Sequence, residues 1–175
     1  KKTYRQANPD QTETSSRLTE TIIYGPSDPV PTASNSHEAL VIELLINNYR
    51  VKKVYVDPGS SVDVMCYRTF ENLKLVRDQL VLVKTPLVGF RGHVVHSKGM
   101  VTLMVTVRRH LRCQTVPINF VVVETDSPYN LLMGPSTLNA LQAVYSTYYL
   151  SFKFPTPVGI VEVNNDVCAA RKRHV

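Results

Sequence analysis

One carboxylate of the sequence lies where it could do acid–base chemistry. An apolar stretch leads directly into Asp57, which is followed by Pro58, Gly59 and the hydroxyls of Ser60 and Ser61. In such a loop, backbone N–H groups and the Ser60 hydroxyl could hold the carboxylate, because Gly59 lets the backbone approach closely. The same residues also suit an ordinary β-turn, with proline at its second position and glycine at its third. The loop alone leaves both interpretations open.

The composition limits what such a site could belong to. The chain has 175 residues, 43% of them hydrophobic, which suits one globular domain and is too short for a two-lobed enzyme with a duplicated core. No apolar run reaches the roughly 18 residues of a membrane span, so we expect no membrane association. The 20 Lys and Arg outnumber the 14 Asp and Glu, giving a net charge of +6. This balance permits an acidic or nucleic-acid partner without indicating one.

Hydrophobic periodicity predicts a protein made mainly of short strands. Residues 39–47 are largely apolar and residues 49–56 are rich in β-branched and aromatic residues, with Asn47 and Asn48 between them, which predicts a β-hairpin. Residues 100–107 alternate between Val or Leu and Thr or Met, as in a half-buried strand. Further strands are expected at 114–123 and 148–154, and short helices at 67–75 and 136–143. The fold class that follows is all-β with two short helices, as a small barrel or folded sheet.

The two ends of the chain differ in character from the middle. Residues 1–36 are polar with a proline-rich end, which predicts a linker or extended arm, with 21–24 pairing as an edge strand. Residues 158–175 are polar and end in a basic cluster, which predicts a flexible basic tail. The globular domain is therefore expected at 37–157.

Four motifs of this globular part occur in the order found in one protease family. Residues 57–61 (DPGSS) resemble the family's D-x-G-S-S loop, and residues 85–92 (TPLVGFRG) with Gly99 resemble its flap hairpin. Residues 129–134 (YNLLMG) resemble its apolar–apolar–Gly motif, and residues 136–156 resemble the helix and final strand that follow. Over about 37–157 the sequence is similar to the retropepsin-like aspartic protease domain of retrotransposon Gag-Pol polyproteins, particularly the plant Ty3/gypsy type.

The resemblance implies a fold, a reaction and an oligomeric state. The fold is a single-lobe closed barrel, and the reaction is hydrolysis of peptide bonds in a retroelement polyprotein. Asp57 is implied as the catalytic residue, oriented by Gly59 and Ser60, with Ser61 as part of the same active-site loop. An aspartic protease needs two carboxylates that share one proton, and this chain has one D-x-G motif. A homodimer that brings two copies of Asp57 together is therefore expected, without cofactor or metal.

Other aspartates do not supply the second carboxylate. Asp63 falls in the expected lead-in to the first helix, and the residues around Asp126 lack the glycine of the motif. The resemblance further assigns residues 89–92, which are Gly89, Phe90, Arg91 and Gly92, to a flap that clamps an extended polypeptide substrate. The same residues also suit a plain hairpin loop.

Two departures from the family pattern keep a second interpretation open. Pro58 replaces a Thr or Ser whose hydroxyl and N–H cross-link the two loops of the dyad, and it has neither group. Gly134 is followed by Pro135 where the family usually has arginine. The alternative function is a catalytically silent dimerisation or peptide-binding module.

Other classes of site and partner have weaker sequence support. His93, His96, His110 and Cys113 match a zinc-ligand count, but residues three apart on a strand point to opposite faces. The basic stretch 108–112 has few aromatic residues near it, so we do not expect nucleic-acid binding by this domain. The cysteines form no CxxC pair and the N-terminal stretch is hydrophilic, so we expect an intracellular location, in the cytoplasm or alternatively the nucleus.

Overall fold

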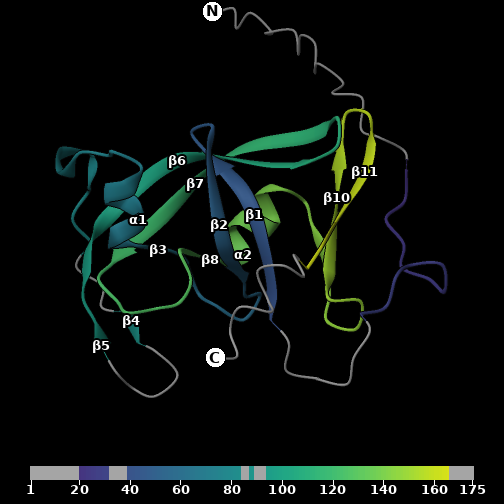
Figure 1. Cartoon of the computed structure of the whole chain (residues 1–175), viewed down its shortest axis with the longest axis horizontal. Helices are drawn as coiled ribbons and strands as arrows, with labels where there is room; N and C mark the ends of the chain where they lie inside the picture. Colours follow the sequence, from purple (N-terminus) through teal and green to yellow (C-terminus); the bar gives the residue numbers. More distant parts are fainter. Residues whose placement is uncertain (1–19, 32–38, 84–86, 89–93, 166–175) are drawn as a thin grey trace, which may run out of the picture.

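The computed structural model describes residues 20–31, 39–83, 87–88 and 94–165, which are mostly β-structure (Figure 1). Its strands in chain order are β1 (Leu40–Ile46), β2 (Tyr49–Val56), β3 (Asp63–Cys66), β4 (Leu87–Val88), β5 (Val94–Val95), β6 (Ser97–Arg109), β7 (Arg112–Val123), β8 (Leu131–Met133), β9 (Val144–Ser146), β10 (Ser151–Thr156) and β11 (Gly159–Asn164). The α-helices among the described residues are α1 (Tyr67–Asn72) and α2 (Pro135–Ala140), and η1 (Arg77–Gln79) is a 3-10 turn. The expected all-β class with two short helices is confirmed.

Six strands close into a barrel in the order β1-β2-β8-β3-β7-β6, as expected for a single-lobe fold. Strands β9, β10 and β11 form a separate sheet, and β4 pairs with β5. Figure 1 shows β10 and β11 at one end of the barrel and α1 at the opposite end. Within the barrel, β2 runs parallel to β8, with Val56 opposite Met133. The end of β2, where Asp57 follows, therefore lies beside the end of β8.

Local chemistry explains the β1–β2 hairpin and the long strand β6. Asn47 and Asn48 join β1 to β2 with φ angles of 46° and 70°, the left-handed conformations that a two-residue hairpin turn requires. In β6, Val101 and Leu103 are buried while Thr102 faces solvent. The predicted hairpin and the predicted alternating strand are both confirmed, and the alternation continues through most of the longer β6.

The prediction of a flexible tail from residue 158 is wrong for the residues of β11. This strand pairs with β10 along its whole length, and Val161 and Val163 are buried in the hydrophobic core. Phe152 and Phe154 of β10 belong to the same core cluster as the barrel residues. The sequence signal for this strand was present, because residues 158–163 (VGIVEV) are rich in β-branched residues, but the polar and basic residues that follow dominated the interpretation of the tail.

Two smaller expectations also need correction. The segment 21–24 does not pair as an edge strand; the Tyr24 side chain packs instead against Ser151 of β10 and Tyr149 of the turn before it. Asp63 is not in a helix lead-in but opens β3, opposite Phe120 of β7. Strand β3 is short, and three of its four residues are buried, so it lacks the alternation that would have revealed it.

Candidate active site

Asp57 follows the last residue of β2 and begins a tight turn. Its backbone N–H donates to the carbonyl oxygen of Met133 at 2.9 Å, and its own carbonyl accepts from the N–H of Ser60 at 3.2 Å. The Gly59 N–H donates to Asp57 Oδ1 at 3.0 Å, so a backbone group fixes one carboxylate oxygen. The side chain is half-buried, which leaves the carboxylate accessible from outside the barrel.

The glycine of the turn is required for space. Gly59 does not take a positive φ, so the turn is not of type II. A Cβ at this position would lie 3.3 Å from Asp57 Oδ1, a tight contact. Gly59 therefore allows its N–H to approach the carboxylate.

The two serines of the loop do not share one role. The Ser60 hydroxyl donates to the carbonyl of Val62 at 2.8 Å and accepts from the Val62 N–H at 3.3 Å. The Ser60 hydroxyl therefore fixes the backbone between residues 60 and 62. It does not hold the carboxylate of Asp57, in contrast to the sequence expectation. Ser61 is exposed.

Asp63 was not identified as a site residue from the sequence. It is completely buried directly behind the loop, and its Oδ1 accepts from the Gly134 N–H at 2.7 Å and from the Thr137 hydroxyl at 2.8 Å. A Cβ on Gly134 would lie 2.8 Å from the carbonyl oxygen of Val62, so only glycine fits against the loop. The 71 residues that separate Asp63 from Gly134 hid this contact from sequence inspection.

Tyr55, two residues before Asp57, belongs to an aromatic group with Tyr129. Tyr55 stacks on Tyr129 with ring centroids 5.0 Å apart. Burial raises the pKa of Tyr145 on β9, and the nearby Tyr55 and the carboxylate of Asp57 raise that pKa further. The position of Tyr55, two residues before Asp57 on the same strand, was the sequence signal for this group.

The hairpin expected to cover the site is described only at its base. Leu87 pairs with Val95 and Val88 with Val94, in antiparallel register. The predicted flap residues Gly89, Phe90, Arg91 and Gly92 lie outside the described residues. Strands β4 and β5 thus form a hairpin stem that leads into β6.

Comparison with solved structures identifies this arrangement of barrel, loop and hairpin. The retroviral protease-like domain of Ddi1 from Leishmania major aligns with a TM-score of 0.52 and 18% identity, over 74% of this chain and 97% of that one. EIAV protease in complex with the inhibitor HBY-793 aligns with a TM-score of 0.50 and 18% identity, over 65% of this chain and 98% of that one. The chain has a retropepsin-like fold. No family model and no curated protein matches the sequence.

The structure shows what two departures from the retropepsin-like pattern do locally. Pro58 is exposed at the top of the turn and supplies no N–H. Pro135 is the first residue of α2, a position where its fixed φ suits the helix and its missing N–H has no intrahelical partner to lose. The substitution at 135 therefore suits the local helix geometry.

The metal-ligand and cysteine candidates can be compared with the described residues. No group of three or more His, Cys, Asp or Glu among them is arranged to hold a metal, and His93 lies outside them. Burial raises the pKa of the Cys66 thiol, which donates to the Tyr129 carbonyl. Within the described part of the chain, no helix is long and apolar enough to cross a membrane.

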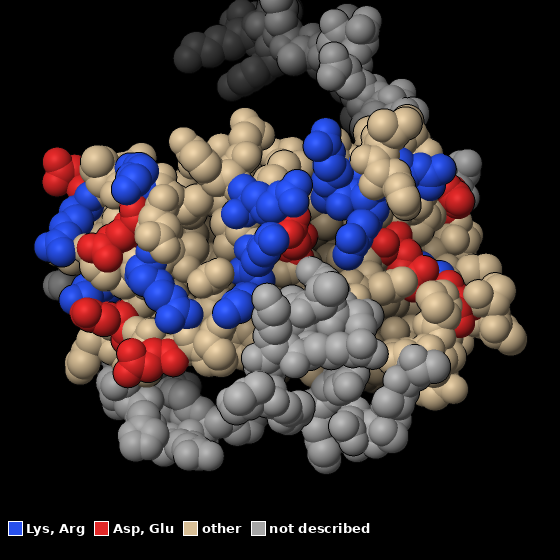
Figure 2. Space-filling view, viewed as in Figure 1, with Lys and Arg blue, Asp and Glu red and all other residues tan. Residues whose placement is uncertain are grey.

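The basic stretch 108–112 is partly used in holding the fold together. Arg109 donates to the Asn164 carbonyl at 3.3 Å, and Arg112 donates to the Ile160 carbonyl at 2.8 Å, so both arginines bind the backbone of β11. On the face of the molecule drawn in Figure 2, Lys and Arg are interspersed with Asp and Glu. These arginines therefore have a structural role whether or not this surface has a partner.

Proposed function

We propose that the protein is an aspartic endopeptidase whose active site forms between two copies, each supplying Asp57. The observation that supports this most directly is the half-buried Asp57 carboxylate, held by the Gly59 N–H at the end of a strand of a retropepsin-like barrel. Two such carboxylates side by side share one proton, because both cannot ionise at close range. One then acts as general base on a water molecule while its protonated partner donates to the scissile carbonyl.

The need for two copies follows from the single loop. The chain has one D-x-G sequence, and its other buried aspartate, Asp63, is enclosed behind the loop. A two-fold axis beside Asp57 would complete the pair with a self-complementary contact. Apolar surface is available nearby, since Val144 and Tyr148, which flank Tyr145 on and after β9, are 44% and 70% exposed.

The proposed substrate is an extended polypeptide. Strands β4 and β5 provide the stem of a hairpin, and a hairpin over the dyad would clamp a peptide through backbone hydrogen bonds. The similarity of the sequence to retrotransposon proteases favours a retroelement polyprotein as that peptide. An intracellular site of action, expected from the cysteine usage, is part of the same proposal.

A cleavage assay tests the proposed function. The purified protein is expected to cut a peptide mixture at mildly acidic pH and to be inhibited by a statine-type transition-state mimic. Asp57→Asn should abolish cleavage while leaving folding and dimerisation intact. Cleavage should also fall on dilution below the dimer dissociation constant. Equal background cleavage by wild type and Asp57→Asn would reject the proposal.

A catalytically silent binding module is the second candidate, and Pro58 is the observation that favours it. With neither hydroxyl nor N–H, Pro58 cannot donate a hydrogen bond between two facing loops. If wild type dimerises without cleaving, Pro58→Ser tests whether Pro58 alone accounts for the missing activity. Activity gained in that variant would show a silent descendant of a protease, whereas continued silence would favour a module whose site has been lost more widely.

A further inference from the structure

We infer that Asp63 is a positioning residue for Asp57, acting through the single peptide group between Met133 and Gly134. This inference rests on the proposed function and extends it to a residue outside the D-x-G-S-S loop. The reactive group in this scheme is the Asp57 carboxylate, and Asp63 touches neither it nor a substrate. Its effect is on the backbone from which that carboxylate projects.

The first step of the argument is the geometry of one peptide group. The Met133 carbonyl accepts from the Asp57 N–H at 2.9 Å, and the Gly134 N–H donates to Asp63 Oδ1 at 2.7 Å. The carbonyl of residue 133 and the N–H of residue 134 belong to the same peptide unit. No cis peptide is present in the described chain, so these two groups point in opposite directions. The peptide therefore lies between the start of the loop and the residue that follows its end.

The second step is that these two hydrogen bonds reinforce each other. The hydrogen bond that the Gly134 N–H donates to Asp63 Oδ1 involves the same peptide unit as the Met133 carbonyl. Such a bond polarises the peptide and makes its carbonyl a better acceptor. The bond from the Asp57 N–H to Met133 is thus strengthened by Asp63 on the other side, which holds the Asp57 backbone more tightly.

The third step is that Asp63 itself has little freedom to move. Thr137, in the first turn of α2, donates a second hydrogen bond to the same oxygen, Oδ1, at 2.8 Å. Gly134 lies against the Val62 carbonyl without room for a Cβ, so a shift at Gly134 would displace the loop. The loop, the end of β8 and the start of α2 are therefore joined around one carboxylate oxygen.

The fourth step concerns the cost of placing a carboxylate there. Asp63 is 0% exposed, and its second oxygen, Oδ2, has no hydrogen-bond partner among the described residues. The salt bridges within the described residues do not include it. Burying a carboxyl group without full compensation is unfavourable, so an apolar side chain would serve better if the position only filled space. The two bonds accepted by Oδ1 are the gain that distinguishes Asp63 from such a side chain.

Three variants of the full chain test the inference. Asp63→Ala removes both hydrogen bonds, whereas Asp63→Asn keeps an oxygen that can accept both. Val163→Ala is the control for lost stability. Val163 lies on β11 in the β9–β10–β11 sheet and is 1% exposed. The number of active sites is titrated with a tight statine-type inhibitor, so that kcat refers to folded dimers. Exchange of the Asp57 amide proton is followed by NMR in parallel.

The expected result is a selective effect of Asp63→Ala on turnover. Its kcat per titrated site should fall by about ten- to a hundredfold while KM changes little, as expected for a misplaced catalytic group. The Asp57 amide should exchange faster than in Val163→Ala, and Asp63→Asn should restore both properties. If Asp63→Ala does not fold, Thr137→Val, which removes one of the two donors, should show smaller changes in the same direction.

Several outcomes would overturn the inference. Unchanged kcat per site in Asp63→Ala, with Asp57 exchange equal to that of Val163→Ala, would show a purely structural residue. An Asp63→Asn variant as impaired as Asp63→Ala would show that the Oδ1 bonds are not responsible. If wild type has no activity, the proposed function fails first, and the amide-exchange comparison still decides whether Asp63 holds the backbone of Asp57.

Discussion

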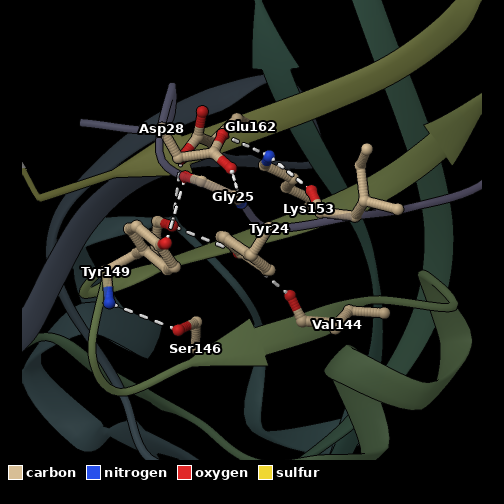
Figure 3. A network of polar contacts seen from close by, with 10 residues as sticks. Tyr24, Gly25, Asp28, Val144, Ser146, Tyr149, Lys153 and Glu162 are labelled. Carbon is tan, nitrogen blue, oxygen red and sulfur yellow. Dashed lines mark hydrogen bonds and ion pairs between the residues drawn. The ribbon is translucent and has the colours of Figure 1, made fainter. Parts of the chain in front are cut away.

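Asp28 and Asp63 each join two distant parts of the chain, but their surroundings differ. Asp28, on the segment 20–31, forms an ion pair with the ammonium group of Lys153 on β10 (Figure 3). Asp63 has two uncharged donors, and no ion pair in the described chain includes it. The first junction depends on opposite charges on side chains that are 11% and 13% exposed, and the second on a peptide and a hydroxyl in the core. Acid should therefore weaken the first junction, because a protonated Asp28 no longer forms an ion pair with the Lys153 ammonium group.

The junction at Asp28 also shows how a polar segment can become part of a fold. Tyr24 stacks on Tyr149 with ring centroids 5.0 Å apart, and the Lys153 ammonium lies 4.4 Å from the centroid of the Tyr24 ring. The Tyr149 hydroxyl donates to the Gly25 carbonyl at 3.0 Å (Figure 3). Residues 20–31 are thus attached to the β9–β10–β11 sheet by aromatic and polar contacts rather than by a hydrophobic stripe.

The largest effect on stability and activity should come from adding a side chain at Gly134, where the end of β8 contacts the loop after Asp57. Gly134→Ala would place a methyl group 2.8 Å from the Val62 carbonyl, so the loop or α2 must move. We expect the free energy of unfolding to fall by about 3 kcal/mol, as for severe overpacking, and cleavage to be lost. Urea unfolding measures the first and a peptide assay the second. Gly25→Ala is the matched control, because its Cβ would meet no atom within 4 Å.

A smaller effect is expected on the carboxylate side of the same loop. Gly59→Ala would put a Cβ 3.3 Å from Asp57 Oδ1 and leave the junction at Asp63 intact. The carboxylate must rotate or the turn must widen, so kcat should fall by about tenfold with stability nearly unchanged. Steady-state kinetics beside urea unfolding separates these quantities. A loss of stability as large as that of Gly134→Ala would show that the two sides of the loop are not independent.

The stability contributed by the Asp28–Lys153 ion pair should depend on pH, and Asp28→Asn should remove this dependence. The hydrogen bond from Lys153, followed by that from the Gly25 N–H, holds the pKa of Asp28 below its ordinary value of 3.8. The folded state therefore favours the charged form, and this stabilisation is present above 3.8 and lost as the pH falls through the lowered pKa. Urea midpoints measured from neutral to strongly acidic pH should fall more steeply for wild type than for Asp28→Asn. Parallel curves would contradict this difference.

The smallest effect is expected at an ion pair that joins neighbouring strands rather than distant segments. Glu43 and Arg50 lie 3.1 Å apart on β1 and β2, and the Arg50 side chain is 68% exposed. Glu43→Gln should change the free energy of unfolding by less than about 0.5 kcal/mol, because water screens the pair. The same urea titration tests it. A larger change would show that an exposed ion pair between neighbouring strands also contributes substantially to the stability of this protein.

What the sequence predicted depended on local signals. The turn at Asn47, the alternation in β6 and the loop at Asp57 are each defined by neighbouring residues, and the structure contains all three. The contacts of Asp63 and of the segment 20–31 were not predicted, because their partners lie far away in the chain. Hydrogen bonds join Asp63 to Gly134 across 71 positions and Lys153 to Asp28 across 125. Pattern and propensity do not register such pairings.

The contact between Asp57 and Met133 has a consequence for how the chain is made. The sequence of the loop leaves the ribosome well before β8 and α2, the elements that hold it in shape. Pairing across so long a separation has a high entropic cost of closure and forms late in folding. During synthesis, Asp57 would therefore remain in an unshaped loop until residues up to Thr137 have emerged. A nascent chain would therefore contain Asp57 well before the elements that shape its loop have been synthesised.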